Sequence, residues 1–311
     1  MTQQDGELNS GLFRTDPCRF IENAIKDYVR TSPLNHLTAF GNAPIVDEPI
    51  IAFADGDDPI FQEYKTVIGD FHLKPRELLE KYIAAKRWRF GAKGSIDSVG
   101  VVSWALPLTH ETRLHERSSP FGGSPRYNHS RWIGIKLYEC VEQFVASLLE
   151  VMGCNAVAPT QSRFFEIKDM PGGWMAANWS ERHVAYACGL GTFGLNGLMI
   201  TSRGCAVYLG SVVCDQALTP TLRAASRVAN CPYFQDGSCG LCIEHCTGSA
   251  INNEGRSNIA CLKNLRDEQA TRVISNGLDK GLVGPAPACG RCSTGLPCEE
   301  RIPPMALKQR V

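Results

Sequence analysis

Cysteine is concentrated near the carboxyl end of this chain, and that constrains the fold more than any other feature. Eight of the 14 cysteines lie beyond residue 230, and eight thiolates are what two cubane iron–sulfur clusters require. The run from Cys239 to Cys246 has the spacing C-x2-C-x3-C, which ends the bacterial C-x2-C-x2-C-x3-C signature. The last cysteine of that signature binds the neighbouring cluster. The spacing therefore predicts two [4Fe-4S] clusters held by one segment.

The eight cysteines are expected to form two sets of four. The first cluster would be held by Cys231, Cys239, Cys242 and Cys298. The second would be held by Cys246, Cys261, Cys289 and Cys292. The signature places its first cysteine three residues before Cys239, where this chain has Asp236. Cys231, Asp236 or a three-iron cluster could account for this departure, and the preference of iron–sulfur chemistry for thiolate favours Cys231.

Zinc and disulfide bonds are alternative uses of these cysteines. Two C-x2-C pairs could form one zinc site, but 46 residues separate Cys242 from Cys289. Zinc ribbons usually have about 15–20 residues there. Disulfide frameworks are typical of small secreted domains, whereas 311 residues can bury a core, and residues 1–10 do not resemble a signal peptide. We expect reduced cysteines and a cytoplasmic protein. The remaining six are expected to be small buried residues: Cys18, Cys140, Cys154, Cys188, Cys205 and Cys214.

The composition limits the partners that this chain is expected to have. Thirty-two basic residues balance 32 acidic ones, so no overall positive field attracts nucleic acid or anionic lipid. A nucleic-acid partner is therefore not expected. The longest apolar runs are about ten residues, half of what a membrane-spanning helix needs. No membrane span is expected either.

Hydrophobic periodicity predicts an α+β fold. Helices are expected over 17–31, 75–88, 131–152 and 180–188, and strands over 98–106, 198–202 and 205–213. The stretch 41–75 is rich in proline and is expected to be an irregular extension. The stretch 109–130 is expected to be a long functional loop. With 219–230 as a linker, the chain divides into a body over 1–218 and a cluster domain over 219–311.

Several short motifs in the same order resemble the epoxyqueuosine reductases and, more distantly, the respiratory reductive dehalogenases. They span about 125–298 and comprise Glu181-Arg182, Gly189-Leu-Gly191-x-x-Gly194-x-Asn196, Leu209-Gly210-Ser-Val-Val with Asp215, and the cluster cysteines. The resemblance implies a nitroreductase-related body that binds cobalamin, followed by a ferredoxin-like domain with two [4Fe-4S] clusters. It also implies a corrin pocket lined by Gly189, Gly191, Gly194 and Asn196. The glycines match the dinucleotide fingerprint too, but they follow a helix and precede a strand, the reverse of its usual context.

The chain departs from the family pattern at several points. Leu195 replaces a lysine, and Met175 replaces the proton-donating aspartate, with Asp169 the nearest acid upstream. Thirteen residues follow Cys298 where many relatives have a helical-repeat tail, and no twin-arginine signal is present. A tRNA substrate and respiratory dehalogenation are therefore not expected. The catalytic residues stay unassigned, with Tyr127 and Asp169 as candidates for delivering a proton.

The leading hypothesis is an iron–sulfur oxidoreductase. Its clusters would receive electrons from a ferredoxin or flavodoxin and pass them to a bound cobalamin, which reduces a small molecule. The alternative is a non-catalytic electron carrier, or a reductive activator of a corrinoid protein or another redox enzyme.

Overall fold

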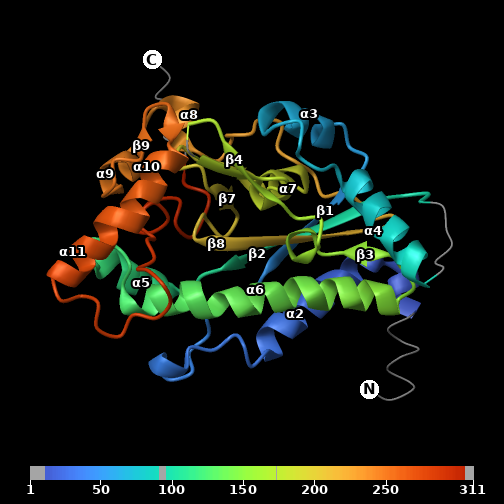
Figure 1. Ribbon diagram of the computed structural model, residues 1–311, viewed down its shortest axis with the longest axis horizontal. Coiled ribbons are helices and arrows are strands. Elements are labelled where there is room, and N and C mark those ends of the chain that lie inside the picture. Colours follow the sequence, from blue (N-terminus) through green and yellow to red (C-terminus); the bar gives the residue numbers. More distant parts are fainter. Residues whose placement is uncertain (1–10, 91–95, 173, 305–311) are drawn as a thin grey trace.

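A four-stranded antiparallel sheet forms the centre of the molecule. The computed structural model describes residues 11–90, 96–172 and 174–304. The strand order is β1-β2-β8-β3, where β1 is Ile50–Asp55, β2 is Gly100–Pro107, β8 is Val207–Cys214 and β3 is Ala156–Val157. Figure 1 shows helices on both sides of this sheet, with the carboxyl-terminal segment at one end. The expected α+β class is thus confirmed.

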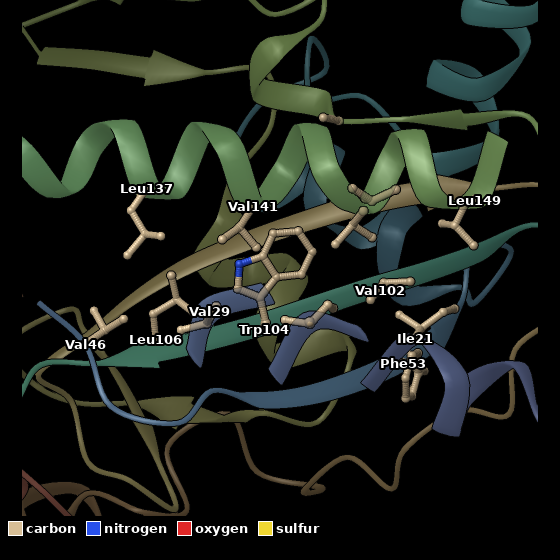
Figure 2. Packing of buried hydrophobic residues seen from close by; sticks show 14 of the residues in the cluster. Ile21, Val29, Val46, Phe53, Val102, Trp104, Leu106, Leu137, Val141 and Leu149 are labelled. Atoms are coloured by element: carbon tan, nitrogen blue, oxygen red, sulfur yellow. The ribbon is translucent and has the colours of Figure 1, made fainter. Parts of the chain in front are cut away.

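The first layer of helices comprises α2 (Pro17–Thr31) and α6 (Pro125–Val151). The start of α2 is the one that the sequence predicts, because the Asp16 side chain accepts a hydrogen bond from Arg19 N. Figure 2 shows Trp104 of β2 lying between these helices and the sheet. Its cross-strand partner is Gly210, where a Cβ atom would lie 2.8 Å from the indole ring. Gly210 therefore makes room for the largest side chain of this core.

The second layer lies on the opposite face of the sheet and contains α3 (Ile60–Val67), α4 (Pro75–Phe90) and α7 (Glu181–Ala187). Alternate residues of β2 separate the two cores: Val102 packs toward α6, and Val101 packs toward α7. Two short hairpins flank α7. They are β4 (Ile167–Met170) with β5 (Trp174–Ala177), and β6 (Gly191–Phe193) with β7 (Met199–Thr201).

The carboxyl-terminal segment consists of short elements joined by turns. They are α8 (Pro232–Asp236), α9 (Leu241–His245), β9 (Ile251–Asn252), β10 (Gly255–Arg256), α10 (Asn258–Lys263) and α11 (Gln269–Ser275). The segment 219–230 runs beside β1, where Thr221 exchanges two hydrogen bonds with the backbone of Phe53. The predicted linker is therefore attached to the edge of the sheet.

Two sequence expectations are wrong. The stretch 41–75 is not irregular, since it contains β1 and α3. The stretch 109–130 is not a long loop, since α5 (His110–Ser118) and the first turns of α6 lie within it. Helix α5 is mostly polar and lacks a clear apolar stripe, so periodicity could not reveal it. Polar contacts with the carboxyl-terminal segment hold it in place.

Candidate functional site

The structure brings the first predicted quartet of cysteines around one cavity. Its lining includes Cys231, Cys239, Cys242 and Cys298. Cys231 directly precedes α8, and Cys242 lies in α9. Burial raises the pKa of Cys242 to about 12, and the neighbouring Cys298, Cys231 and Cys239 contribute in the same direction. Four thiolates here would need the compensating positive charge of bound metal.

The second predicted quartet lines a different cavity of about 520 Å³, which contains Cys246, Cys261, Cys289 and Cys292. Cys246 caps the end of α9, so the chain turns between it and Cys242. Burial raises the pKa of Cys292 to about 11, while the charge of Arg256 opposes this shift. Arg256 Nη2 also donates a hydrogen bond to Cys261 Sγ at 3.2 Å. This guanidinium is suited to stabilise negative charge on the quartet.

The two candidates for the missing position of the signature have different surroundings. Cys231 lines the first cavity. Asp236 Oδ1 instead accepts a hydrogen bond from Ser238 N at 2.8 Å. Within the described ranges, no three His, Cys, Asp or Glu side chains are grouped closely enough to hold a single metal ion. A cubane spreads its four thiolates farther apart, because each binds a different iron.

The cluster region is held to the body by α5 and the start of α6. Glu116 on α5 accepts hydrogen bonds from the backbone N–H groups of Gly123, Ser124 and Gly290, each at 2.8 Å. Burial raises the pKa of Glu116, although these three donors oppose the shift. Gly290 lies between Cys289 and Cys292. Glu116 therefore positions the loop that supplies half of the second quartet.

A buried ion-pair network holds the segment next to Cys298, a member of the first quartet, against α5. Glu299, only 1% exposed, accepts from Arg113 Nε at 2.9 Å and from Arg117 Nη2 at 2.6 Å. Its neighbour Cys298 lines the first cavity. Arg113, Glu116 and Glu299 are not among the site residues expected from the sequence. Their charges, spread between residues 113 and 299, gave no local signal of pairing.

A third cavity of about 630 Å³, which we call the body cavity, lies beside α7. Its lining includes Met175, Trp179, Glu181, Arg182 and His183. It shares four lining residues with the second-quartet cavity: Leu198, Cys205, Val207 and Tyr208. A ligand in the body cavity would therefore be separated from the second quartet by these side chains.

The candidate proton donors lie apart from each other. Tyr127 is buried and lines the second-quartet cavity. Burial raises its pKa well above the usual value. Asp169 is exposed on β4, directly opposite Met175 of β5. The two residues do not form one site, and a catalytic role for either stays a prediction.

The glycine segment is shaped by close packing. A Cβ atom on Gly189 would lie 2.7 Å from the Leu222 carbonyl oxygen, and one on Gly191 would lie 2.4 Å from that of Ile200. Gly194 and Asn196 line the first-quartet cavity, and Asn196 Nδ2 donates to the Cys292 carbonyl at 2.7 Å. Among the residues described around the body cavity, none of these four occurs. Their cofactor-binding role stays a prediction.

No helix of the described residues has both the length and the apolar composition that crossing a bilayer demands. No protein-family model matches the chain, and no curated protein matches it.

Solved structures of epoxyqueuosine reductases are similar in part. The enzyme from Bacillus subtilis is 19% identical with a TM-score of 0.42, and the match covers 83% of this chain and 65% of that one. The enzyme from Streptococcus thermophilus is 18% identical with a TM-score of 0.42 and the same coverage. This chain thus spans just under two thirds of the length of these enzymes.

A third structure corrects one expectation. It is an epoxyqueuosine reductase with an epoxyqueuosine-modified tRNA stem loop, 16% identical with a TM-score of 0.40, and the match covers 76% of this chain and 54% of that one. The expectation that nucleic acid is an unlikely partner is contradicted by this complex. A net charge of zero does not by itself exclude nucleic acid, because such a protein can still carry a local positive surface.

Proposed function

We propose that this chain is an iron–sulfur oxidoreductase with two [4Fe-4S] clusters. One observation supports it above all others: the cysteines that the signature assigns to two clusters line two separate cavities, four in each. Thiolate is the donor that iron–sulfur clusters use, and each predicted quartet has the four donors that a cubane takes. Cys205 lines the second-quartet cavity in addition. The carboxyl-terminal segment would then act as a ferredoxin-like domain over 219–311.

Electrons would leave the clusters toward the body cavity. The second-quartet cavity adjoins it through shared side chains, among them Cys205 and Tyr208. A cobalamin bound in a nitroreductase-related body would supply a strongly reducing cobalt centre. Arg182 and Tyr208 line the cavity and offer polar groups to a ligand there. A cytoplasmic ferredoxin or flavodoxin is the proposed electron donor.

Metal analysis tests the cluster assignment directly. Protein purified without oxygen should contain about eight irons and about eight acid-labile sulfides per chain. Cys239→Ser and Cys289→Ser should each remove about four irons, because each variant takes one ligand from a different cubane. Cys140→Ser, a half-buried cysteine on α6 away from both quartets, is the matched control. Stoichiometric zinc without iron would overturn the proposal.

The visible spectrum of the protein after incubation with cobalamin tests whether the body binds a corrin. Stoichiometric corrin that stays with the protein through gel filtration is the expected result. The reduced holoprotein can then be assayed with two candidate substrates, an epoxyqueuosine-modified tRNA stem loop and the free epoxyqueuosine nucleoside. Turnover of the nucleoside alone would indicate a small-molecule reductase.

The alternative, an electron carrier without its own substrate, is favoured by Met175. This residue lines the body cavity where the resemblance implies a proton-donating aspartate. A carrier would contain iron and exchange electrons with partners, but would bind no stoichiometric corrin.

A further inference from the structure

Glu181 is the one carboxyl group among the described residues that line the body cavity. Its Oε1 accepts a hydrogen bond from Ser211 Oγ at 3.0 Å. Ser211 Oγ in turn accepts from Trp179 Nε1 at 3.0 Å. Glu181 Oε2 is buried and has no hydrogen-bond partner. The side chain is therefore fixed through one oxygen, while the other makes no hydrogen bond within the protein.

An ionised carboxylate would be costly in this position. Water is excluded from Oε2, and no donor replaces it, so the charged form is disfavoured. Burial, together with the nearby Glu142, raises the pKa of Glu181 to about 8. Burial also raises the pKa of Glu142 to about 7. At neutral pH Glu181 is a carboxylic acid, with its proton on Oε2 because Ser211 donates to Oε1.

The other ionisable groups around Glu181 do not compete as proton donors near pH 7. Burial lowers the pKa of His183 to about 4, so the ring is neutral. Burial raises the pKa of Tyr208, which makes the phenol a weak acid. The neighbouring elements carry these ionisable groups: Arg182, His183 and Tyr186 on α7 with Cys188 directly after it, Tyr208 and Cys214 on β8, Glu63, Tyr64 and Lys65 on α3, and His72, which stacks on Trp179. On α6, Glu142 is the group whose charge affects Glu181. The described parts of β2, β6 and β7 contribute none.

We propose that Glu181 is the proton donor of the body cavity, delivering the proton of Oε2 to the ligand that is reduced there. This inference rests on the proposed function, since it requires a reduction in this cavity. The ligand takes up two electrons, supplied one at a time by a reduced ferredoxin or flavodoxin, and two protons. The O–H bond of Glu181 breaks as one proton is transferred, and the carboxylate regains a proton from solvent. The second proton comes from solvent.

Infrared spectroscopy tests the acid without any turnover. The wild-type protein at pH 6.5 should show the C=O stretching band of a buried, protonated carboxyl group, and the band should disappear as the pH rises past about 8. Glu181→Gln should lose the component of this band that titrates near pH 8. Glu166→Gln, which changes an exposed carboxylate before β4, is the matched control and should retain it. Because Glu142 is also an acid with a raised pKa, Glu142→Gln identifies its own contribution to the band.

Steady-state kinetics test whether Glu181 transfers its proton to the ligand. In the holoprotein loaded with clusters and cobalamin, Glu181→Gln should lower kcat on the epoxyqueuosine-modified stem loop by about 100-fold or more, with little change in KM. The wild-type rate should fall above about pH 8 as the acid loses its proton, and the variant should not show this limb. Glu181→Asp should recover part of the rate. A merely structural role would change stability but leave the shape of the pH profile intact.

Failure of the proposed function and failure of the proton-donor role of Glu181 would give different results. A protein without iron or bound corrin defeats the proposed function, and the carboxyl band then decides alone whether Glu181 is an acid. A wild-type protein without that band, or a Glu181→Gln holoprotein with the wild-type rate and pH profile, overturns the proton-donor role while leaving the proposed function standing.

Discussion

Cys205 Sγ lies 3.7 Å from Cys298 Sγ, and Cys205 N donates a hydrogen bond to the Cys298 carbonyl oxygen at 2.8 Å. Cys205 is buried, as the sequence predicts, but it adjoins a candidate cluster ligand. It also lines both the second-quartet cavity and the body cavity. One thiol therefore contacts three parts of the proposed electron path.

Replacing Cys205 should alter the first cluster without removing it. Hydrogen bonds to ligand sulfur tune cluster potentials, so Cys205→Ala should retain about eight irons but shift the midpoint potential of one cluster. Electron paramagnetic resonance during a redox titration measures the shift. Cys298→Ser should instead lose about four irons. If Cys205→Ala also lost four, Cys205 would be a ligand.

Asn196 connects the two cavities, and its removal should weaken the cluster region. It is 2% exposed, lines the first cavity and donates to Cys292 O. Asn196→Ala should lower the free energy of unfolding by about 1–3 kcal/mol, because it leaves the partly buried Cys292 carbonyl without a donor. Anaerobic urea titration measures this. The exposed Asn253→Ala is the control, and equal losses in both variants would contradict the prediction.

Glu299 should be one of the residues most sensitive to substitution outside the cysteines. Glu299→Ala would leave the buried Arg113 without its main partner and should cost about 3–5 kcal/mol of unfolding free energy. The iron content should fall as well, since Cys298 is adjacent. Glu300→Ala breaks a more exposed contact with the same arginine and should cost at most about 1 kcal/mol. Similar stabilities for the two variants would disprove the assigned importance of the network.

The features that could be predicted from the sequence depend on residues close together in the chain. Asp16 and Pro17 define the start of α2, and the apolar stripe predicts most of α6, because capping and periodicity act over a few residues. Cysteine spacing likewise predicts two quartets, and the structure groups the cysteines in this way. Ligation itself stays a proposal.

The features that depend on contacts between distant residues could not be predicted from the sequence. Helix α5 is polar and is held by the contacts of Glu116 with Gly290 and of Arg113 with Glu299, and each contact joins residues more than 150 positions apart. Strand β1 lies between prolines, which hid it among turn signals, although its pairing with β2 is regular. The carboxyl of Glu181 acquires its character from Ser211 and from burial, neither of which the motif Glu181-Arg182 shows.

The pair Glu142 and Glu181 should make the folded protein less stable as the pH rises. Burial raises both pKa values in the folded state, to about 7 and about 8, from 4.5. The folded state then binds more protons than the unfolded state between pH 4.5 and 8, so the free energy of unfolding falls with rising pH across that window. The loss should be on the order of 1–3 kcal/mol after allowance for relaxation around the pair.

Urea titrations of the anaerobic protein between pH 5 and 9 measure this dependence. Glu142→Gln should flatten the decline, because one of the two groups no longer has to lose its proton in a buried site. Glu166→Gln should preserve the wild-type slope, because its carboxylate is exposed in both states. A wild-type protein whose stability rises from pH 5 to 8 would show that the two carboxyl groups are ionised in the fold, and Glu181 could not then be the acid of the body cavity.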